Sequence, residues 1–297
     1  MTEDQTATDE LQDLIDVLEL EQLEVNLFRG RSRELRADRV FGGQVLGQAL
    51  SAAGRTVEDR EVHSLHAYFL RAGDPAVPIV YNVDRSRDGR SFTNRRVVAI
   101  QHGRPILNLA ASFQVPEEGL THGSEMPGVP SPDELQPLHV ALDECGPGLP
   151  DKVRRLIDHQ RPFEFRPVNP VDVMNPRKRP PRQCIWFRTV SPVNVPEHMN
   201  RCLLAYVSDY NLLPTAVFPH GVSFLDGRLQ MASLDHAMWF HHPAPLGEWL
   251  LYDIESPGAA GGRGFTRASI YAADGTLIAS TAQEGVIRLW EKARLPS

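Results

Sequence analysis

The segment RVFGGQVLGQALSAAGRT, residues 39–56, decides how the first half of this chain folds. Gly42 and Gly43 stand near its start and Gly54 near its end. Between them the apolar residues recur at the period of an α-helix, at Val45, Leu46, Ala49, Leu50 and Ala53. Gly47 and several alanines keep this helix slim and apolar on most sides, which is typical of a helix enclosed by other structure. We therefore expect a buried central helix.

Four strand-like runs follow the predicted helix. They are EVHSLHAYFL (61–70), VPIVYNVDRSR (77–87), SFTNRRVVAIQ (91–101) and RPILNLAASFQV (104–115), and turn signals such as Asp88-Gly89 and His102-Gly103 separate them. An amphipathic helix is expected over residues 11–23 and a strand over residues 24–32, whereas the polar residues 1–10 are expected to be disordered. An antiparallel sheet wrapped around one central helix is the packing that this order of elements favours.

The second part of the chain repeats that order. A strand is predicted at 183–191, a helix at 198–213 and four strands between 228 and 290. Short words also recur in the same order: SLHAYF at 64 and SLDHAMWF at 233, GRSF at 89 and GRGF at 262, AASFQ at 110 and ASTAQ at 279. We interpret 1–115 as an N-terminal half, 184–297 as a C-terminal half and the proline-rich stretch 116–183 as the crossing between them. A ligand site is then expected between the halves.

Composition and charge disfavour several classes of function. The chain has 297 residues and a formal net charge of −7, which disfavours a general nucleic-acid binder. Three widely spaced cysteines, Cys145, Cys184 and Cys202, form no CxxC pair, which favours a reducing compartment over a disulfide framework or a zinc site. The start of the chain is acidic and no apolar run approaches a membrane span. Cytoplasmic residence follows by elimination.

Several sequence segments resemble those of a known family. VFGGQVLGQAL, VHSLHAYFLRAGD, SDYNLLPTAVFPHG, SLDHAMWFH and STAQEGVIR are similar to segments of type II acyl-CoA thioesterases of the TesB class, over roughly residues 13–290. The resemblance implies an α+β double hot dog fold, in which two antiparallel sheets, each wrapped around a central helix, join into one continuous sheet. It also implies hydrolysis of fatty acyl-CoA to free fatty acid and CoA, without a metal or another cofactor. A homo-oligomer is expected because such sheets often pair edge to edge.

The resemblance assigns the hydrolytic water to three residues: Asp209, Ser233 and Gln283. Asp209 stands among apolar residues, where a carboxylate is costly unless something nearby needs it. It can accept a proton from the water while the hydroxyl and the amide orient that water, and burial would raise the pKa of the acid. Taken singly, each of the three is an ordinary capping or strand residue. Ser233 replaces the threonine of related bacterial enzymes and is less constrained without the methyl group.

Four further residues are candidates for substrate binding. Gly43 stands with Gly42 at the start of the first central helix, and either this glycine pair or the turn after Asp209 can offer a backbone N–H to the developing oxyanion. His63 lies near the thioester or is a hydrogen-bonded core histidine. Arg90, grouped with Arg87, Arg95 and Arg96, and Arg263, with Arg267, either meet the phosphates of CoA or simply solvate a sheet face.

The sequence disfavours two other kinds of chemistry. The chain has no GxSxG elbow, so an α/β serine hydrolase is disfavoured. His220, His236, His241 and His242 lack a matching set of carboxylates or cysteines and are interpreted as structural rather than as metal ligands. Two alternatives stay open: a hot dog hydratase or dehydratase acting on enoyl-CoA, and a non-catalytic acyl-CoA-binding module.

Overall fold

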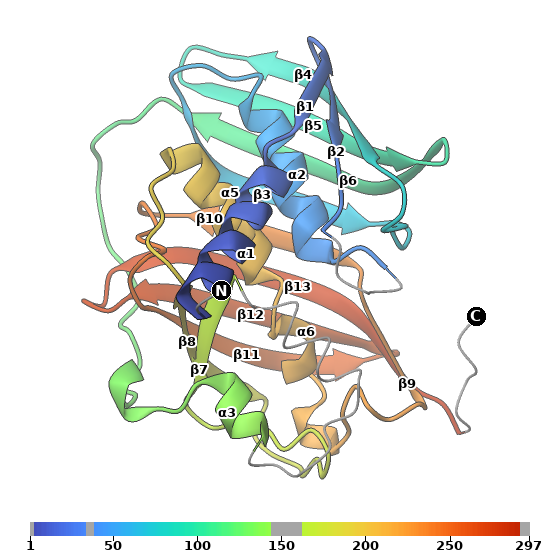
Figure 1. Cartoon of the computed structure of the whole chain (residues 1–297), viewed down its shortest axis with the longest axis vertical. Helices are drawn as coiled ribbons and strands as arrows, with labels where there is room; N and C mark the ends of the chain where they lie inside the picture. Colours follow the sequence, from blue (N-terminus) through green and yellow to red (C-terminus); the bar gives the residue numbers. More distant parts are fainter. Residues whose placement is uncertain (1–2, 34–38, 144–161, 292–297) are drawn as a thin grey trace.

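The computed structural model describes residues 3–33, 39–143 and 162–291. Its centre is one antiparallel sheet in which thirteen strands are hydrogen-bonded side by side (Figure 1). The strand order is β1-β2-β4-β5-β6-β3-β10-β13-β12-β11-β8-β7, with β9 pairing only β13. The continuous sheet of the double hot dog fold, predicted from the resemblance, is therefore confirmed.

The described residues of the first half form two helices and six strands. Their bounds are α1 Glu3–Leu18, β1 Glu21–Glu24, β2 Leu27–Gly30, α2 Gly42–Gly54, β3 Glu61–Phe69, β4 Ile79–Asp88, β5 Phe92–Gln101 and β6 Arg104–Gln114. The crossing then carries η1 Pro132–Glu134 and α3 Leu138–Asp143.

The second half uses the same elements again. Its bounds are β7 Phe163–Pro167, β8 Arg182–Thr189, α5 Glu197–Ser208, α6 Leu212–Thr215, η2 Phe218–His220, β9 Leu229–Ser233, β10 Asp235–Phe240, β11 Leu250–Ala260, β12 Arg263–Ala272 and β13 Leu277–Leu289.

The two halves meet where β3 pairs β10, with Tyr68 opposite Asp235 and Ser64 opposite Trp239. Outward from this junction the strands follow equivalent orders, β3-β6-β5-β4-β2-β1 on one side and β10-β13-β12-β11-β8-β7 on the other. In this arrangement β7 is the counterpart of β1. The sheet of the second half thus begins at Phe163, inside the stretch that we interpreted as linker, because β7 pairs β8 along its whole length.

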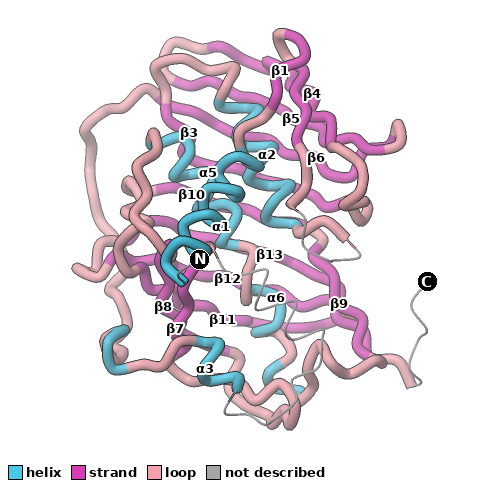
Figure 2. The backbone as a smooth tube through the Cα atoms, viewed as in Figure 1, coloured by secondary structure: helices cyan, strands magenta, loops and turns pink. Residues whose placement is uncertain are grey.

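Helices α2 and α5 lie side by side on one face of the sheet, with α1 against them (Figures 1 and 2). Glycine allows this close approach. A Cβ atom on Gly43 would overlap the backbone oxygen of Tyr206, and one on Gly47 would lie 3.0 Å from the backbone oxygen of Cys202. All of α2 from Gly43 to Ala53 is buried, as the apolar pattern predicted.

Three local expectations need correction. Residues 3–10, expected to be disordered, form the first turns of α1, because packing of the buried Leu11 and Leu14 stabilises the helix into which they lead. The strand expected at 24–32 is instead the hairpin of β1 and β2. The second central helix, expected to run to residue 213, stops at Ser208. Asn211 adopts a left-handed conformation (φ 65°), which an α-helix cannot continue through, and α6 begins after it.

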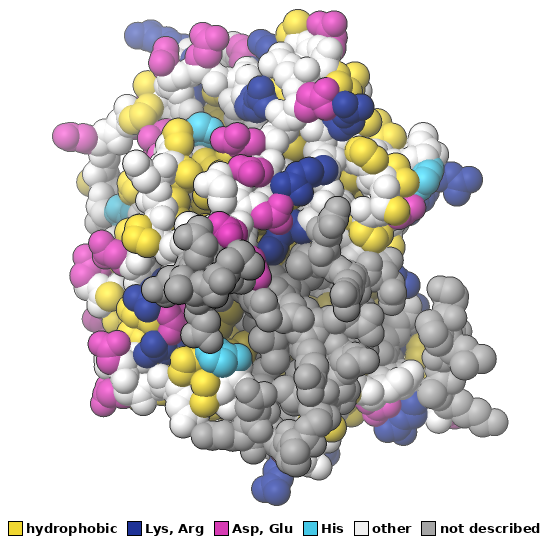
Figure 3. Space-filling model, in the orientation of Figure 1, with side chains coloured by type: hydrophobic (Ala, Val, Ile, Leu, Met, Phe, Trp, Pro, Cys, Tyr) yellow, Lys and Arg dark blue, Asp and Glu magenta, His cyan; other side chains and the backbone are white. Residues whose placement is uncertain are grey.

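On the face shown in Figure 3, acidic and basic side chains of the described residues are interspersed. None of the helices in the described part of the chain has the length and apolar character that crossing a lipid bilayer requires.

Candidate active site

Asp209 caps the C-terminal end of α5 and is held against the N-terminal end of α2. Its side chain is only 6% exposed. The backbone N–H of Gly43 donates a hydrogen bond to the carboxylate, and a Cβ atom on Gly42 would lie 2.6 Å from Oδ2. The glycine pair in the fold-deciding segment thus lets the start of one central helix touch an acid at the end of the other. The partial positive charge of a helix N-terminus favours a carboxylate there.

Gln283 joins the last strand to this acid. Its side chain is buried, and Nε2 donates to Oδ1 of Asp209 at 2.7 Å. Burial raises the pKa of Asp209 to about 6, although the hydrogen bonds from Gln283 and from the Gly43 backbone oppose the shift. The acid is therefore ionised at neutral pH, yet it is a stronger base than an exposed aspartate.

His236 completes a buried polar group that the sequence had not placed in the site. Its Nδ1 lies 3.2 Å from Nε2 of Gln283, and its Nε2 lies 3.0 Å from Oγ of Ser208. Burial lowers the pKa of His236 to about 3, so the imidazole is neutral at physiological pH. We had interpreted this histidine as structural. The Asp-His pair at the start of its strand was the available signal, but only the pairing of β10 with β13 shows which residue the ring faces.

Ser233 reaches the same face of the sheet because of a bulge. It lies opposite Gly285, whereas Ala237 lies opposite Ala282, so the β9–β10 side carries one extra residue against β13. Residues directly opposite share a face, and Gln283 and Gly285 alternate onto the same face, so Ser233 is a diagonal neighbour of Gln283. Diagonal neighbours lie about 7–8 Å apart between Cα atoms, which their side chains and one water molecule can span.

Comparisons with known proteins show the family of this chain. Residues 154–286 match the family model for acyl-CoA thioesterase, and residues 32–114 match that for the acyl-CoA thioesterase N-terminal domain. The chain is 43% identical to acyl-CoA thioesterase 2 of Haemophilus influenzae over 285 residues, 96% of this chain and 100% of the relative. It is also 43% identical to human acyl-coenzyme A thioesterase 8, over 92% of this chain and 88% of the relative.

A solved structure gives the same result. The crystal structure of the acyl-CoA thioesterase II TesB2 from Mycobacterium marinum superposes with a TM-score of 0.76 at 42% identity, covering 94% of this chain and 99% of that one. The chain belongs to the type II acyl-CoA thioesterase family. The resemblance and the enzyme class predicted from the sequence are confirmed.

The structure brings only some of the predicted residues of this thioesterase together. Asp209, Gln283 and Gly43 are in contact, and Ser233 lies beside them. His63 lies about 17 Å along β3 from Tyr68, the residue that faces Asp235, so it is remote from the acid within one chain. His63 instead pairs with Ser112 (Nε2 to Oγ, 2.8 Å).

The two predicted arginines also lie away from the acid. Arg90 lines a cavity of about 460 Å³ together with His63 and Phe92. Arg263 is half exposed and donates to Glu284 at 2.9 Å. Since successive strand residues point to opposite faces, Glu284 and its arginine lie on the other side of β13 from Gln283.

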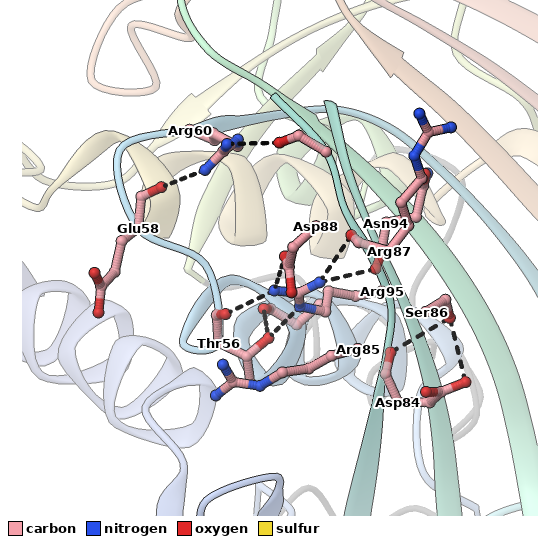
Figure 4. Close-up of polar contacts among 12 residues, drawn as sticks. Thr56, Glu58, Arg60, Asp84, Arg85, Ser86, Arg87, Asp88, Asn94 and Arg95 are labelled. Atoms are coloured by element: carbon pink, nitrogen blue, oxygen red, sulfur yellow. Dashed lines mark hydrogen bonds and ion pairs between the residues drawn. The ribbon is translucent and has the colours of Figure 1, made fainter. Parts of the chain in front are cut away.

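One of the arginines that we grouped with Arg90 has a structural role. Arg95 is buried and lies at the centre of the cluster in Figure 4. It donates to Asp88 Oδ1 at 2.6 Å and to both the hydroxyl and the backbone oxygen of Thr56. These bonds fasten the β4–β5 hairpin to the turn after α2, so Arg95 is not available to a phosphate.

The first half holds a counterpart of the site without its polar groups. The bulge in β3 follows Val62, which faces Phe113. In the same way, the bulge between β9 and β10 follows Ser233, which faces Gly285. Val62 therefore corresponds to Ser233 and Ala111 to Gln283. The C-cap of α2 is Arg55, where that of α5 is Asp209. A cavity of about 290 Å³ lies at this end, but the acid, the hydroxyl and the amide are replaced by Arg55, Val62 and Ala111.

Proposed function

We propose that this chain hydrolyses fatty acyl-CoA to fatty acid and free CoA at the site formed by Asp209, Ser233 and Gln283. The observation that carries the proposal is the buried Asp209 carboxylate, which is held through Oδ1 by Gln283 and has a pKa raised to about 6. An acid with that pKa is ionised at pH 7 and is still basic enough to take a proton from water. Because the counterpart end lacks all three groups, we propose one working site in each chain.

In the proposed reaction, one water molecule attacks the thioester carbon directly. Ser233 and Gln283 orient the water, and the second carboxylate oxygen of Asp209, Oδ2, accepts its proton as the new C–O bond forms. The carbonyl oxygen takes up the negative charge until the C–S bond breaks, and the proton held by Asp209 then neutralises the departing CoA thiolate. No acyl-enzyme forms. Positioning removes the entropic cost of bringing water to the carbon, and the general base contributes about 10²–10⁴-fold.

The oxyanion requires a donor other than Gly43, whose N–H is already engaged by Asp209. We assign this role to the N–H of Gly42, one residue earlier in the first turn of α2. This residue lies next to the base, since a Cβ atom on it would lie 2.6 Å from Oδ2, and it stands at the positive end of the helix dipole.

The deciding experiment measures thiol release from a ladder of acyl-CoA chain lengths by the wild type and by Asp209→Asn. We expect the variant to fold and to lose most turnover at every chain length, while a matched change at Asp226, which pairs with Arg228 on the surface, leaves turnover intact. Wild-type rates from Asp209→Asn would refute the assignment of the base. Hydration of enoyl-CoA without thiol release would favour the hydratase, and binding without either reaction would favour the acyl-CoA-binding module.

We also propose that the enzyme is a homo-oligomer. Tyr68 and Trp239 flank the β3–β10 junction and are 61% and 37% exposed. Strand alternation directs both to the face opposite the helices, because their neighbours Ala67 and Met238 are buried. A second copy covering this face would bury these aromatic side chains. Light scattering of the wild type and of Tyr68→Ser combined with Trp239→Ser tests this, and a monomeric wild type would refute it.

A further inference from the structure

A buried chain of hydrogen bonds lies behind Gln283. We propose that His236 and Ser208 act as positioning residues, which hold the Gln283 amide in the one orientation that turns its carbonyl oxygen toward the attacking water. This inference rests on the proposed function, because it concerns how the residue that orients the water is itself oriented.

The orientation of the amide follows from its neighbours. An ionised carboxylate can only accept hydrogen bonds, so the Gln283 atom that lies 2.7 Å from Oδ1 of Asp209 must be the nitrogen. That same nitrogen lies 3.2 Å from Nδ1 of His236. An amide nitrogen carries two hydrogens, and these two acceptors use both of them.

The tautomer of His236 follows in turn. Since Nδ1 accepts from Gln283, the ring proton of the neutral imidazole must sit on Nε2. Nε2 faces Oγ of Ser208 at 3.0 Å, and that hydroxyl donates its own hydrogen to the backbone oxygen of Ala205 at 2.9 Å. Ser208 is thereby left as an acceptor for His236. The direction of every bond is set, from the backbone of α5 to the carboxylate of Asp209.

We call the chain from Ser208 through His236 to Gln283 the relay. It ends at an acceptor atom that receives no hydrogen bond from the described part of the protein. Oε1 of Gln283 is buried, and within the described residues no donor reaches it. A buried acceptor without a partner is costly, so a ligand that donates a hydrogen is favoured at this position. Water bound there would direct one hydrogen at Oε1 and the other at Asp209, which leaves a lone pair for the thioester carbon.

Loss of the relay would allow the amide to rotate. With His236 unable to accept, a reversed amide presents Nε2 to the water, and a donor at that point occupies the lone pair that must attack the carbon. The binding of the CoA part of the substrate would not change. Loss of the relay is therefore expected to lower kcat with little change in KM.

The test combines an observation on the wild type with a set of variants. Nitrogen NMR of ¹⁵N-histidine-labelled protein, without substrate or turnover, should show His236 as the neutral tautomer protonated on Nε2. Protonation on Nδ1 would overturn the proposal. Because this readout needs no catalysis, it stands even if Asp209→Asn retains full activity and the proposed function fails.

Among the variants, His236→Leu should lower kcat by about 10–100-fold, by analogy with the loss found when the hydrogen-bond partner of a metal ligand is removed. The acid limb of its kcat–pH profile should also move to higher pH, because a weaker hydrogen bond from Gln283 stabilises the ionised form of Asp209 less and so raises the pKa of this acid. His236→Asn can still accept from Gln283 and should recover most of the loss. Ser208→Ala should give a smaller fall than His236→Leu.

A matched pair supplies the control. His241 and Ser280 lie 3.0 Å apart (Nε2 to Oγ), at the other end of the same two-strand pairing. His241→Leu and Ser280→Ala should leave kcat, KM and the acid limb unchanged. Equal losses in the control pair and the relay pair, or equal kcat for His236→Leu and the wild type, would show that His236 has no positioning role.

Discussion

Gln283 donates a 2.7 Å hydrogen bond to Oδ1 of Asp209, although 74 residues separate the two along the chain. The bond joins the last strand of the sheet to the end of the second central helix. It also makes the two carboxylate oxygens unequal, since Oδ1 is held by the amide and Oδ2 faces Gly42. One oxygen thus anchors the acid while the other is placed to accept a proton.

The cost of burying Asp209 predicts that its removal stabilises the protein. The pKa of about 6 in the folded state lies above the usual 3.8, so between these values the folded chain holds a proton that the unfolded chain has lost. The contribution of Asp209 to the free energy of unfolding therefore falls as pH rises from about 4 to 6. Asp209→Asn should be about 2–3 kcal/mol more stable than the wild type at pH 8, and the difference should vanish near pH 4.

Denaturant unfolding at several pH values measures this difference. Asp226→Asn is the control with the opposite sign, because hydrogen bonds from Arg228 lower the pKa of Asp226 to about 2. The stability that Asp226 contributes is present above pH 4 and is lost as pH falls. A wild type more stable than Asp209→Asn at pH 8 would contradict the interpretation of Asp209 as a destabilised acid.

The rate of thioester hydrolysis should depend on the same ionisation. We expect kcat to rise with pH through about 6 and then to level off as Asp209 becomes fully ionised. His236, with a pKa of about 3, should add no limb of its own in this range. Steady-state rates from pH 4.5 to 9 test the prediction, and the limb should disappear in Asp209→Asn. A limb that persists unchanged in that variant belongs to another group.

Gly42→Ala should damage catalysis with little effect on the fold. The new Cβ atom would lie 2.6 Å from Oδ2 of Asp209 and 3.0 Å from the ring of Phe69, so the carboxylate must move. Because displacements of about 1 Å can cost up to about 10²-fold, we expect kcat to fall by at least about 10-fold. Gly54→Ala, at the other end of α2, is the control, since its Cβ atom would meet nothing within 4 Å. Equal activity in both variants would contradict the close contact.

Ser233 should be required for its hydroxyl and not for its size. Ser233→Ala should lower kcat, whereas Ser233→Thr should keep it, because threonine retains the hydroxyl and restricts its rotamers. Rates of CoA release from one acyl-CoA compare the three proteins. Full activity in Ser233→Ala would remove this residue from the water site and leave Asp209 and Gln283 alone.

The arginines of the first half should separate into two kinds. Arg95→Ala should lower the melting temperature, because it removes buried bonds to Asp88 and Thr56. Arg90→Ala should leave stability unchanged and, if Arg90 meets a phosphate of CoA, should raise KM for acyl-CoA but not for an acyl-pantetheine that lacks the nucleotide. Equal KM values for both substrates would exclude Arg90 from phosphate binding.

Much of the candidate site could be predicted from the sequence, because short sequence motifs carry the resemblance to the family. The resemblance pointed to Asp209, Ser233 and Gln283 as candidates, and the apolar pattern predicted the helix that begins at Gly42. His236 was missed because a histidine beside an aspartate on a strand has many structural uses. Its role depends on which residue of β13 faces it, and the bulge between Ser233 and Ala237 decides that pairing. His63 was grouped with the site by resemblance, whereas the sheet places it toward the opposite end of β3.

Helical and strand periodicities are local properties of the chain, so the elements and their duplication could be predicted from the residues alone. Three features appear only in the folded chain: the strand pairing that joins the halves, the contact of Asp209 with the start of α2, and the burial that raises the pKa of Asp209. These depend on segments far apart in the chain, and a shift of one residue in register turns every side chain of a strand to the other face. The strand pairing also shows which positions of the two halves are equivalent, and in the first half these positions hold Arg55, Val62 and Ala111 in place of the acid, the hydroxyl and the amide.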